Sequence, residues 1–318
     1  MKANNEPWKA LFSVNPEILF LTSDIAYHLG RLSVTSTHGY SKKDALDNAS
    51  SCFELLGMKI KPSQKKGLLL GEDIPSQPRA KAIYDLYQDI LKFDPYEETS
   101  LERVEQAYFP EGVPHRMSKE LEGYAFPLPT YKRIPSLMKG LFRFASSRTS
   151  NPITLGALFC FVLTAIAPYS KDNLAIGLFY FHAFLCRYAK NLSGLNLYSL
   201  YIKNGKEIED AYYASCEKMD MSEYILCWMK LLRRSVSSLL LRSVKGDGKT
   251  SPMVDRLLSK MEDGRYYSCA ELLELLGLKS RLGLQKNYLR PALESKLIAM
   301  SNPLVKTDRN QRYIKKGE

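Results

Sequence analysis

The stretch Ile166-Ala167-Pro168-Tyr169-Ser170-Lys171-Asp172-Asn173-Leu174-Ala175 separates two strongly apolar segments, residues 154–165 and 176–185. Nearly every position in these segments is apolar, which is typical of buried core helices. A helix directs its free N–H groups and the positive end of its dipole at the loop that precedes it, so this loop is suited to bind phosphate. The sequence therefore predicts two buried helices joined by a short polar loop that is placed to carry a functional site.

This arrangement resembles the Fic family of AMP-transferases. In that family a buried helix ends in a loop of pattern His-Pro-Phe-x-Asp/Glu-Gly-Asn-Gly-Arg-x-x-Arg, and a second buried helix follows. The resemblance implies a general-base histidine, an acidic ligand for Mg²⁺, and glycines, an asparagine and arginines that hold the phosphates of ATP. In this chain Pro168, Tyr169 (in place of Phe) and Asn173 fit the pattern.

The positions that carry the family's chemistry depart from the pattern. Without a histidine the chain loses general-base help, which is typically worth about 10²–10⁴-fold in rate. A lysine in place of the acid cannot ligate Mg²⁺, which requires oxygen ligands. We therefore expect no catalytic residue in this loop, no Mg²⁺ and no resident cofactor. The departures are Ala167 for the histidine, Lys171 for the acid, Asp172 and Leu174 for the glycines, and Ala175 and Leu178 for the arginines.

Two interpretations of the loop stay open. In the first, Pro168 ends one helix, Ser170 or Asp172 caps the next, and nothing binds. In the second, the charge of Lys171 replaces that of the missing metal, and Lys171, Asp172 and Asn173 still bind a nucleotide such as ATP. An enzyme of this second kind needs a substitute base, for which Asp172 is the nearest candidate.

A helix is predicted from a capping-box-like start at Ser41 to about Leu56. It contains Ser50-Ser51-Cys52-Phe53-Glu54-Leu55, which is similar to the family's inhibitory helix, Ser/Thr-x-x-x-Glu-Gly/Asn. Ser50 and Glu54 match this pattern. The resemblance implies that the glutamate pairs with the second arginine of the loop, but Leu178 stands at that position, so the same ion pair cannot form. Glu54 then reads as a solvated carboxylate on a helix face.

Residues 123–131 lack a helical period and resemble the flap of Fic enzymes, an extended segment on which a target protein can pair as a strand. Pro127 and Pro129 remove N–H donors, so such pairing would be partial. The alternative is an ordered surface loop. Upstream, residues 61–78 are rich in Lys, Pro and Gly and predict a connection, followed by an amphipathic helix over residues 79–91.

Composition excludes several classes of protein. The six cysteines form no CxxC pair and two lie inside the apolar segments, which favours reduced thiols in the cytoplasm over a disulfide or zinc framework. Residues 1–8 lack the apolar segment of a signal peptide. Both apolar segments are shorter than the roughly 20 residues of a membrane span, so no membrane role is expected.

The net charge of +11 favours polyanionic partners.

The sequence predicts a mainly α protein with four parts: an N-terminal helical segment (1–40), a Fic-like helical domain (41–243), a linker (244–252) and a small α/β winged helix-turn-helix domain (253–318). The linker is rich in Gly, Ser, Pro and charge. Residues 253–318 show helix, helix, turn, helix and a strand-like hairpin, an order that also looks like the winged helix often attached to Fic proteins.

Basic residues gather where a winged helix contacts DNA. Residues 253–318 hold 13 Lys/Arg against 8 Asp/Glu. These cations can neutralise phosphates, and Asn287 can reach base edges. A protein partner or a dimer interface is the alternative use of such a domain. The candidate DNA-binding residues are Lys279, Arg281, Lys286, Asn287, Arg290, Arg309 and Arg312.

Three functions follow from these patterns. The first is a catalytically impaired Fic-like protein that acts as a regulatory or signalling module and binds DNA or a protein through residues 253–318. The second is a protein adenylyltransferase or nucleotide-binding protein with altered active-site residues. The third is a transcriptional regulator whose helical domain senses a small ligand or forms a homo-oligomer.

Overall fold

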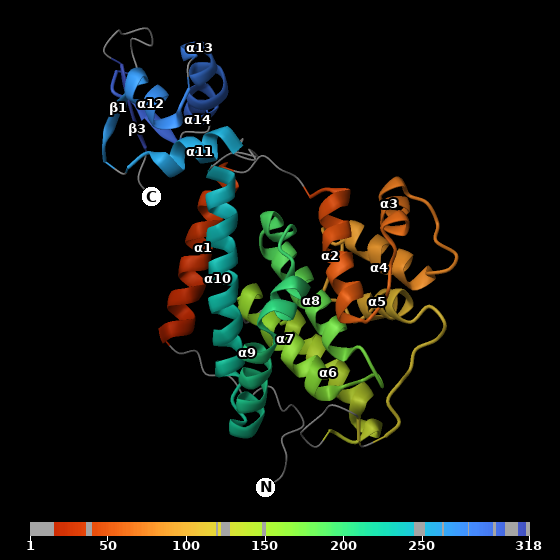
Figure 1. Ribbon diagram of the computed structural model, residues 1–318. Helices are drawn as coiled ribbons and strands as arrows, with labels where there is room; N and C mark the ends of the chain where they lie inside the picture. The colour runs from red at the N-terminus through yellow and green to blue at the C-terminus, as the bar shows by residue number, and fades with distance from the viewer. Residues whose placement is uncertain are drawn as a thin grey trace. The chain divides into compact units, whose positions relative to one another are not determined.

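The computed structural model describes residues 16–35, 40–118, 120–121, 128–147, 151–244, 252–262, 264–278, 280–294, 297–302 and 311–315. The chain divides into two compact units (Figure 1). The helical unit comprises Met1–Ser33 and Thr37–Val236, and the C-terminal unit comprises Val34–Ser36 and Ser237–Glu318. Both units are predominantly helical, as the sequence predicted, with a small sheet in the second.

The described part of the helical unit is built from α-helices and short 3₁₀ turns. In chain order these elements are α1 (Pro16–Thr35), α2 (Lys42–Leu55), α3 (Pro62–Leu70), α4 (Pro78–Gln88), α5 (Ser100–Tyr108), η2 (Tyr131–Arg133), α6 (Ile134–Ser146), α7 (Pro152–Ile166), α8 (Asn173–Tyr188), η3 (Lys190–Leu192), α9 (Leu197–Lys218) and α10 (Ser222–Val244).

Helices α7 and α8 pack against each other at the centre of this unit (Figure 1). Nearly all of their side chains are buried, as the apolar pattern predicted. Two glycines allow the close approach. A Cβ atom on Gly156 would lie 2.4 Å from a ring carbon of Phe181, and one on Gly177 would lie 3.0 Å from the sulfur of Cys160. The two helices are therefore held at a separation that a larger residue at either glycine would disturb.

Local signals place α2 as predicted. The Ser41 side chain accepts a hydrogen bond from the Asp44 N–H, and the Asp44 carboxylate accepts one from the Ser41 N–H, which completes a capping box. By contrast, the connection predicted for residues 61–78 is wrong over its first half, which forms α3. Pro62 at the first turn and Gly71 at the left-handed C-cap delimit this helix. Its apolar residues show no clear helical period, so the sequence did not predict it.

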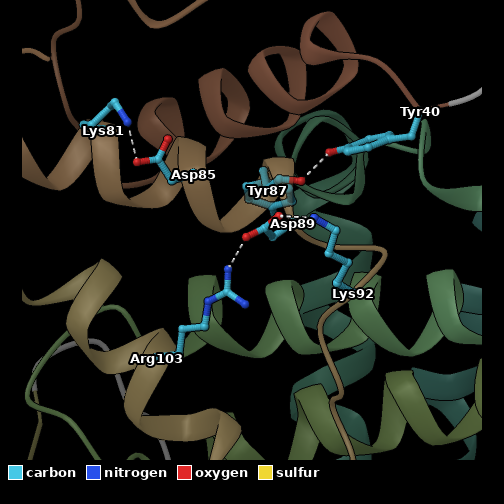
Figure 2. A network of polar contacts seen from close by, with 7 residues as sticks. All are labelled: Tyr40, Lys81, Asp85, Tyr87, Asp89, Lys92 and Arg103. Atoms are coloured by element: carbon cyan, nitrogen blue, oxygen red, sulfur yellow. Dashed lines mark hydrogen bonds and ion pairs between the residues drawn. The ribbon is translucent and has the colours of Figure 1, made fainter. Parts of the chain in front are cut away.

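Helices α4 and α5 are joined by a small network of charges (Figure 2). Asp89, at the end of α4, accepts hydrogen bonds from Arg103 of α5 at 2.7 Å and from Lys92 at 3.3 Å. Lys81 and Asp85 pair one turn apart on α4. These groups are at least partly exposed, so each pair adds little to the free energy of folding.

The C-terminal unit contains a short antiparallel sheet covered by helices. Its described elements are α11 (Pro252–Lys260), β1 (Tyr266–Ser268), α12 (Cys269–Leu276), α13 (Arg281–Leu284), a π-helical turn η4 (Gln285–Leu289), α14 (Arg290–Glu294), β2 (Ile298–Met300) and β3 (Arg312–Lys315). The strand order is β1-β3-β2. Tyr313 of β3 stands opposite both Tyr267 of β1 and Met300 of β2. Strand β1 was not predicted from the sequence.

The third helix of this unit is irregular near Pro291, where the sequence predicts a kink. It runs as α13, the π turn and α14, and the π turn ends at Leu289, two residues before Pro291. A proline has no N–H to donate and its ring crowds the carbonyl four residues back, so a wider π turn relieves the conflict. Within the π turn, residues four apart no longer lie above one another as they do on an α-helix.

Among the described residues, no helix is long and apolar enough to span a membrane, and no His, Cys, Asp and Glu side chains cluster as metal ligands would. All six cysteines are free thiols. Burial raises the pKa of Cys52 to about 11 and that of Cys160 to about 12.

Candidate functional site

The loop between α7 and α8 is held in an unusual backbone conformation. Ala167, which ends α7, has φ 46°, and Asp172, which precedes α8, has φ 66°. Residues other than glycine rarely adopt this left-handed region, because the Cβ atom crowds the backbone. Such a conformation persists only when surrounding contacts enforce it. Those contacts come from Asn173, Arg116, Tyr169 and Arg79.

Asn173 closes the loop from within. Its amide oxygen accepts a hydrogen bond from the Tyr169 N–H at 3.0 Å, and its amide nitrogen donates to the Tyr169 carbonyl at 2.8 Å. The side chain is buried. Because both ends of the amide bind the loop's own backbone, this asparagine holds the loop's shape.

Arg116 closes the C-terminal end of α7. Its Nε donates to the Ala167 carbonyl at 2.7 Å, and its Nη2 donates to the Ile166 carbonyl at 3.1 Å. The last carbonyls of a helix have no partner within the helix and carry its negative dipole end, so a buried guanidinium is well placed there. The backbone also pairs, since the Arg116 N–H donates to the Pro168 carbonyl at 3.0 Å. Sequence reasoning did not single out Arg116.

Tyr169 anchors the middle of the loop in the helical core. Its ring is buried and lies 5.1 Å from the ring of Phe109. Its hydroxyl donates to a carboxylate oxygen of Glu105 at 2.8 Å. Burial and the neighbouring Glu105 carboxylate raise the pKa of this hydroxyl. The tyrosine thus acts as a neutral hydrogen-bond donor that fixes the loop to α5.

Asp172 is engaged by a cation from another helix. Nη2 of Arg79, at the start of α4, lies 2.6 Å from Oδ2 of Asp172. Both side chains are mostly buried. The Arg79 guanidinium also lies 5.8 Å from the ring centre of Phe109. No sequence pattern pointed to Arg79, because 93 residues separate it from its partner.

The positions of the family's two arginines lie in the apolar core. Ala175 is 2% exposed and Leu178 is fully buried. The carbonyl of Ala175 accepts a hydrogen bond from the Tyr198 hydroxyl at 2.9 Å. That hydroxyl shares a further hydrogen bond of 2.7 Å with Tyr108. A hydrogen-bonded pair of tyrosines therefore occupies the space beside α8's first turn.

Lys171 is exposed and lines a pocket of 340 Å³. The same pocket is lined by Arg79, by the residues that start α4, and by Tyr108 and Phe109 at the end of α5. Of the three residues named as nucleotide ligands, Lys171 faces this pocket, whereas Asp172 binds Arg79 and Asn173 binds the loop backbone. Sequence reasoning identified Lys171 but could not place the pocket's other walls.

The residues of the inhibitory-helix-like motif lie on α2. Ser50 is partly exposed and Glu54 is exposed. The structure gives the Glu54 carboxylate no ion pair or hydrogen bond with any described residue. The cation that forms an ion pair with a carboxylate of the loop is Arg79, which comes from α4.

Four of the candidate DNA-binding side chains, Arg281, Lys286, Asn287 and Arg290, are exposed on the third helix of the C-terminal unit. Arg312 is exposed on β3. Lys279 and Arg309 lie outside the described residues, as do residues 122–127 of the flap-like segment and residues 245–251 of the predicted linker.

Comparison with known proteins supports the resemblance drawn from the loop. Residues 252–314 match the family model described as Filamentation induced by cAMP protein Fic-like, C-terminal domain. A Fic family protein from Desulfovibrio desulfuricans G20 superposes with a TM-score of 0.62 at 18% identity, over 96% of this chain and 98% of that chain. The chain has the Fic fold.

A second solved structure, a Fic domain containing signaling protein from Bacteroides thetaiotaomicron VPI-5482, matches at a TM-score of 0.47 and 17% identity, over 71% of this chain and 94% of that chain. No curated protein sequence matches the chain. At 18% identity the likeness to the Desulfovibrio protein establishes the fold alone and leaves the chemistry to the residues of this chain.

Proposed function

We propose that this Fic-fold chain is a regulatory protein without AMP-transfer activity, and that it acts by binding DNA through residues 253–318. The observation that carries the first part is the burial of Ala175 and Leu178 in the core of α8. The side chains at these positions cannot bind the phosphates of ATP, because they carry neither a charge nor a hydrogen-bond donor.

The transfer chemistry also lacks a free general base. Ala167 has no proton acceptor, and its carbonyl is bound by Arg116. Asp172 is the nearest substitute base, but its Oδ2 is already engaged by Arg79 at 2.6 Å. Each of these features opposes the enzyme hypothesis, and none of them opposes a regulatory role.

The DNA hypothesis is supported by the C-terminal unit. Exposed Arg281, Lys286, Asn287 and Arg290 lie along one helix, and Arg312 lies on strand β3 of the same unit. The order of helix, strand, helix, helix and antiparallel hairpin resembles that of a winged helix, in which the third helix would enter the major groove. Exposed cations along that helix would neutralise backbone phosphates.

The test is binding of a fluorescent DNA duplex, followed by anisotropy over a range of salt concentrations. We expect affinity to fall steeply with salt, and each of Lys286→Gln and Arg312→Gln to lower the salt slope by about one. Lys190→Gln, an exposed lysine of the helical unit, removes the same charge and should leave the slope unchanged.

Two outcomes contradict this proposal. Absence of DNA binding at low salt refutes the DNA part and leaves a protein partner for residues 253–318. Transfer of labelled AMP from ATP to any protein, abolished by Asp172→Ala, refutes the regulatory part in favour of an adenylyltransferase with altered residues.

A further inference from the structure

The pocket that Lys171 lines has the properties of a site for a small negatively charged ligand. Its volume of 340 Å³ is at the small end of the range for ligand pockets, about 300–1,000 Å³. It lies within the helical unit, between the start of α4, the end of α5 and the α7–α8 loop. The walls are partly aromatic, from Tyr108 and Phe109.

Two cations in this pocket have unused hydrogen-bonding capacity. The Lys171 ammonium has no ion pair with any described residue. Arg79 binds Asp172 through Nη2 only, and its Nε is buried without a hydrogen-bond partner in the described part of the chain. A buried donor left unsatisfied is unfavourable, and an oxygen atom placed beside it would relieve this cost. Glu111 is the acid in the lining, and its side chain is exposed.

The start of α4 adds to this positive character. Ser76, Gln77 and Pro78 line the pocket, and no side chain caps the helix. The first turn of a helix carries partial positive charge, which favours anions nearby. This helix end supports the site but would not define one without the two cationic side chains.

We propose that this pocket binds an oxyanion group, a phosphate or a carboxylate of a small metabolite, between Lys171 and Arg79. The ligand sits against α4 and α5, outside the first turn of α8, where Ala175 and Leu178 exclude phosphate. The ligand would bridge the loop and α4. The proposal goes beyond the regulatory role above and does not depend on DNA binding.

The experiment is isothermal titration calorimetry of the full chain with inorganic phosphate and, separately, with malonate. Lys171→Gln should weaken binding about ten-fold or more, since charge-assisted hydrogen bonds to the anion are lost. Lys66→Gln, at an exposed position of α3 away from the pocket, removes the same charge and should change affinity little. Ser76→Phe adds a bulky side chain at an exposed lining residue and keeps every charge, so it should also weaken binding.

Each outcome decides the proposal. Phosphate binding that Lys171→Gln and Ser76→Phe both weaken about ten-fold or more supports it and identifies phosphate as the group, whereas malonate binding with the same dependence identifies carboxylate. Equal binding by all variants would mean general attraction to a protein of net charge +11 and overturn the site. Absence of binding at millimolar anion overturns it as well. Circular dichroism of each variant checks that the fold is retained.

Discussion

His182 makes the stability of the helical unit depend on pH. This side chain is fully buried on α8. Its Nε2 lies 3.2 Å from the Leu192 carbonyl, and its Nδ1 has no hydrogen-bond partner among the described residues. Burial lowers its pKa from 6.5 to about 4, because the apolar surroundings disfavour the charged ring.

The sign and size of the effect follow from this shift. In the unfolded chain His182 binds a proton as pH falls through 6.5, whereas the folded chain resists protonation until about pH 4. Stability is therefore fully present above pH 6.5 and is lost as pH falls toward 4. At 1.36 kcal/mol per pKa unit, the total loss is about 3 kcal/mol, of which about 2 kcal/mol falls between pH 7 and pH 5.

The assay is urea unfolding at pH 7 and pH 5, followed by the fluorescence of buried Trp228. His182→Gln removes the titrating group, so the fall in unfolding free energy between the two pH values should shrink by about 2 kcal/mol. His115→Gln, at an exposed histidine, serves as the matched control and should keep most of the wild-type fall. An unchanged pH dependence in His182→Gln, or an NMR titration of His182 near pH 6.5, would refute the reasoning.

Three further predictions concern the loop and the helix pair. Asn173→Ala removes both hydrogen bonds to the Tyr169 backbone and should lower the unfolding free energy by about 2–3 kcal/mol in urea melts; a loss below about 0.5 kcal/mol would mean that the loop does not depend on this amide. Arg116→Met leaves the Ile166 and Ala167 carbonyls without their guanidinium donor and should cost about 3 kcal/mol, whereas Arg103→Met, at an exposed ion pair, should cost less than about 1 kcal/mol; equal losses would contradict the role given to Arg116. Gly156→Ala places a Cβ atom 2.4 Å from Phe181 and should destabilise by about 1–3 kcal/mol in thermal melts, whereas Gly30→Ala on α1 meets no atom within 4 Å and should be neutral or stabilising; an unchanged melting temperature for Gly156→Ala would show that α7 and α8 can move apart freely.

Local sequence patterns were sufficient to predict the helices whose apolar period or capping residues lie within a few positions of one another. The apolar segments predicted α7 and α8, and the Ser41 capping box placed the start of α2. A second capping box, at Ser268, starts α12 in the structure. Gly277, at the end of α12, adopts the left-handed conformation expected of a helix C-cap. The fold resemblance followed from three motif residues, Pro168, Tyr169 and Asn173, although the chemistry of the motif is absent.

Elements with weak local signals were missed. Helix α3 has no clear apolar face, and strand β1 is only three residues long. Pro291 predicted a kink in the third helix of the C-terminal unit, but the form of the irregularity, a π turn over Gln285–Leu289, was not predicted. Strand β1 is stabilised by its pairing with β3. Alternation of apolar and polar residues along so short a segment does not reveal this pairing.

By itself, then, the sequence determined the two buried helices, the polar loop between them and the loss of the residues that the family's chemistry needs. Only the tertiary structure showed which side chains now hold the loop in place. Arg116 reaches a carbonyl 51 residues away, and Arg79 reaches a carboxylate 93 residues away. Contacts of this kind depend on how helices pack, and no periodicity along the chain records which distant cation meets the loop. For the same reason the pocket beside Lys171, with walls from separate elements, became visible only once α4, α5 and the loop were placed together.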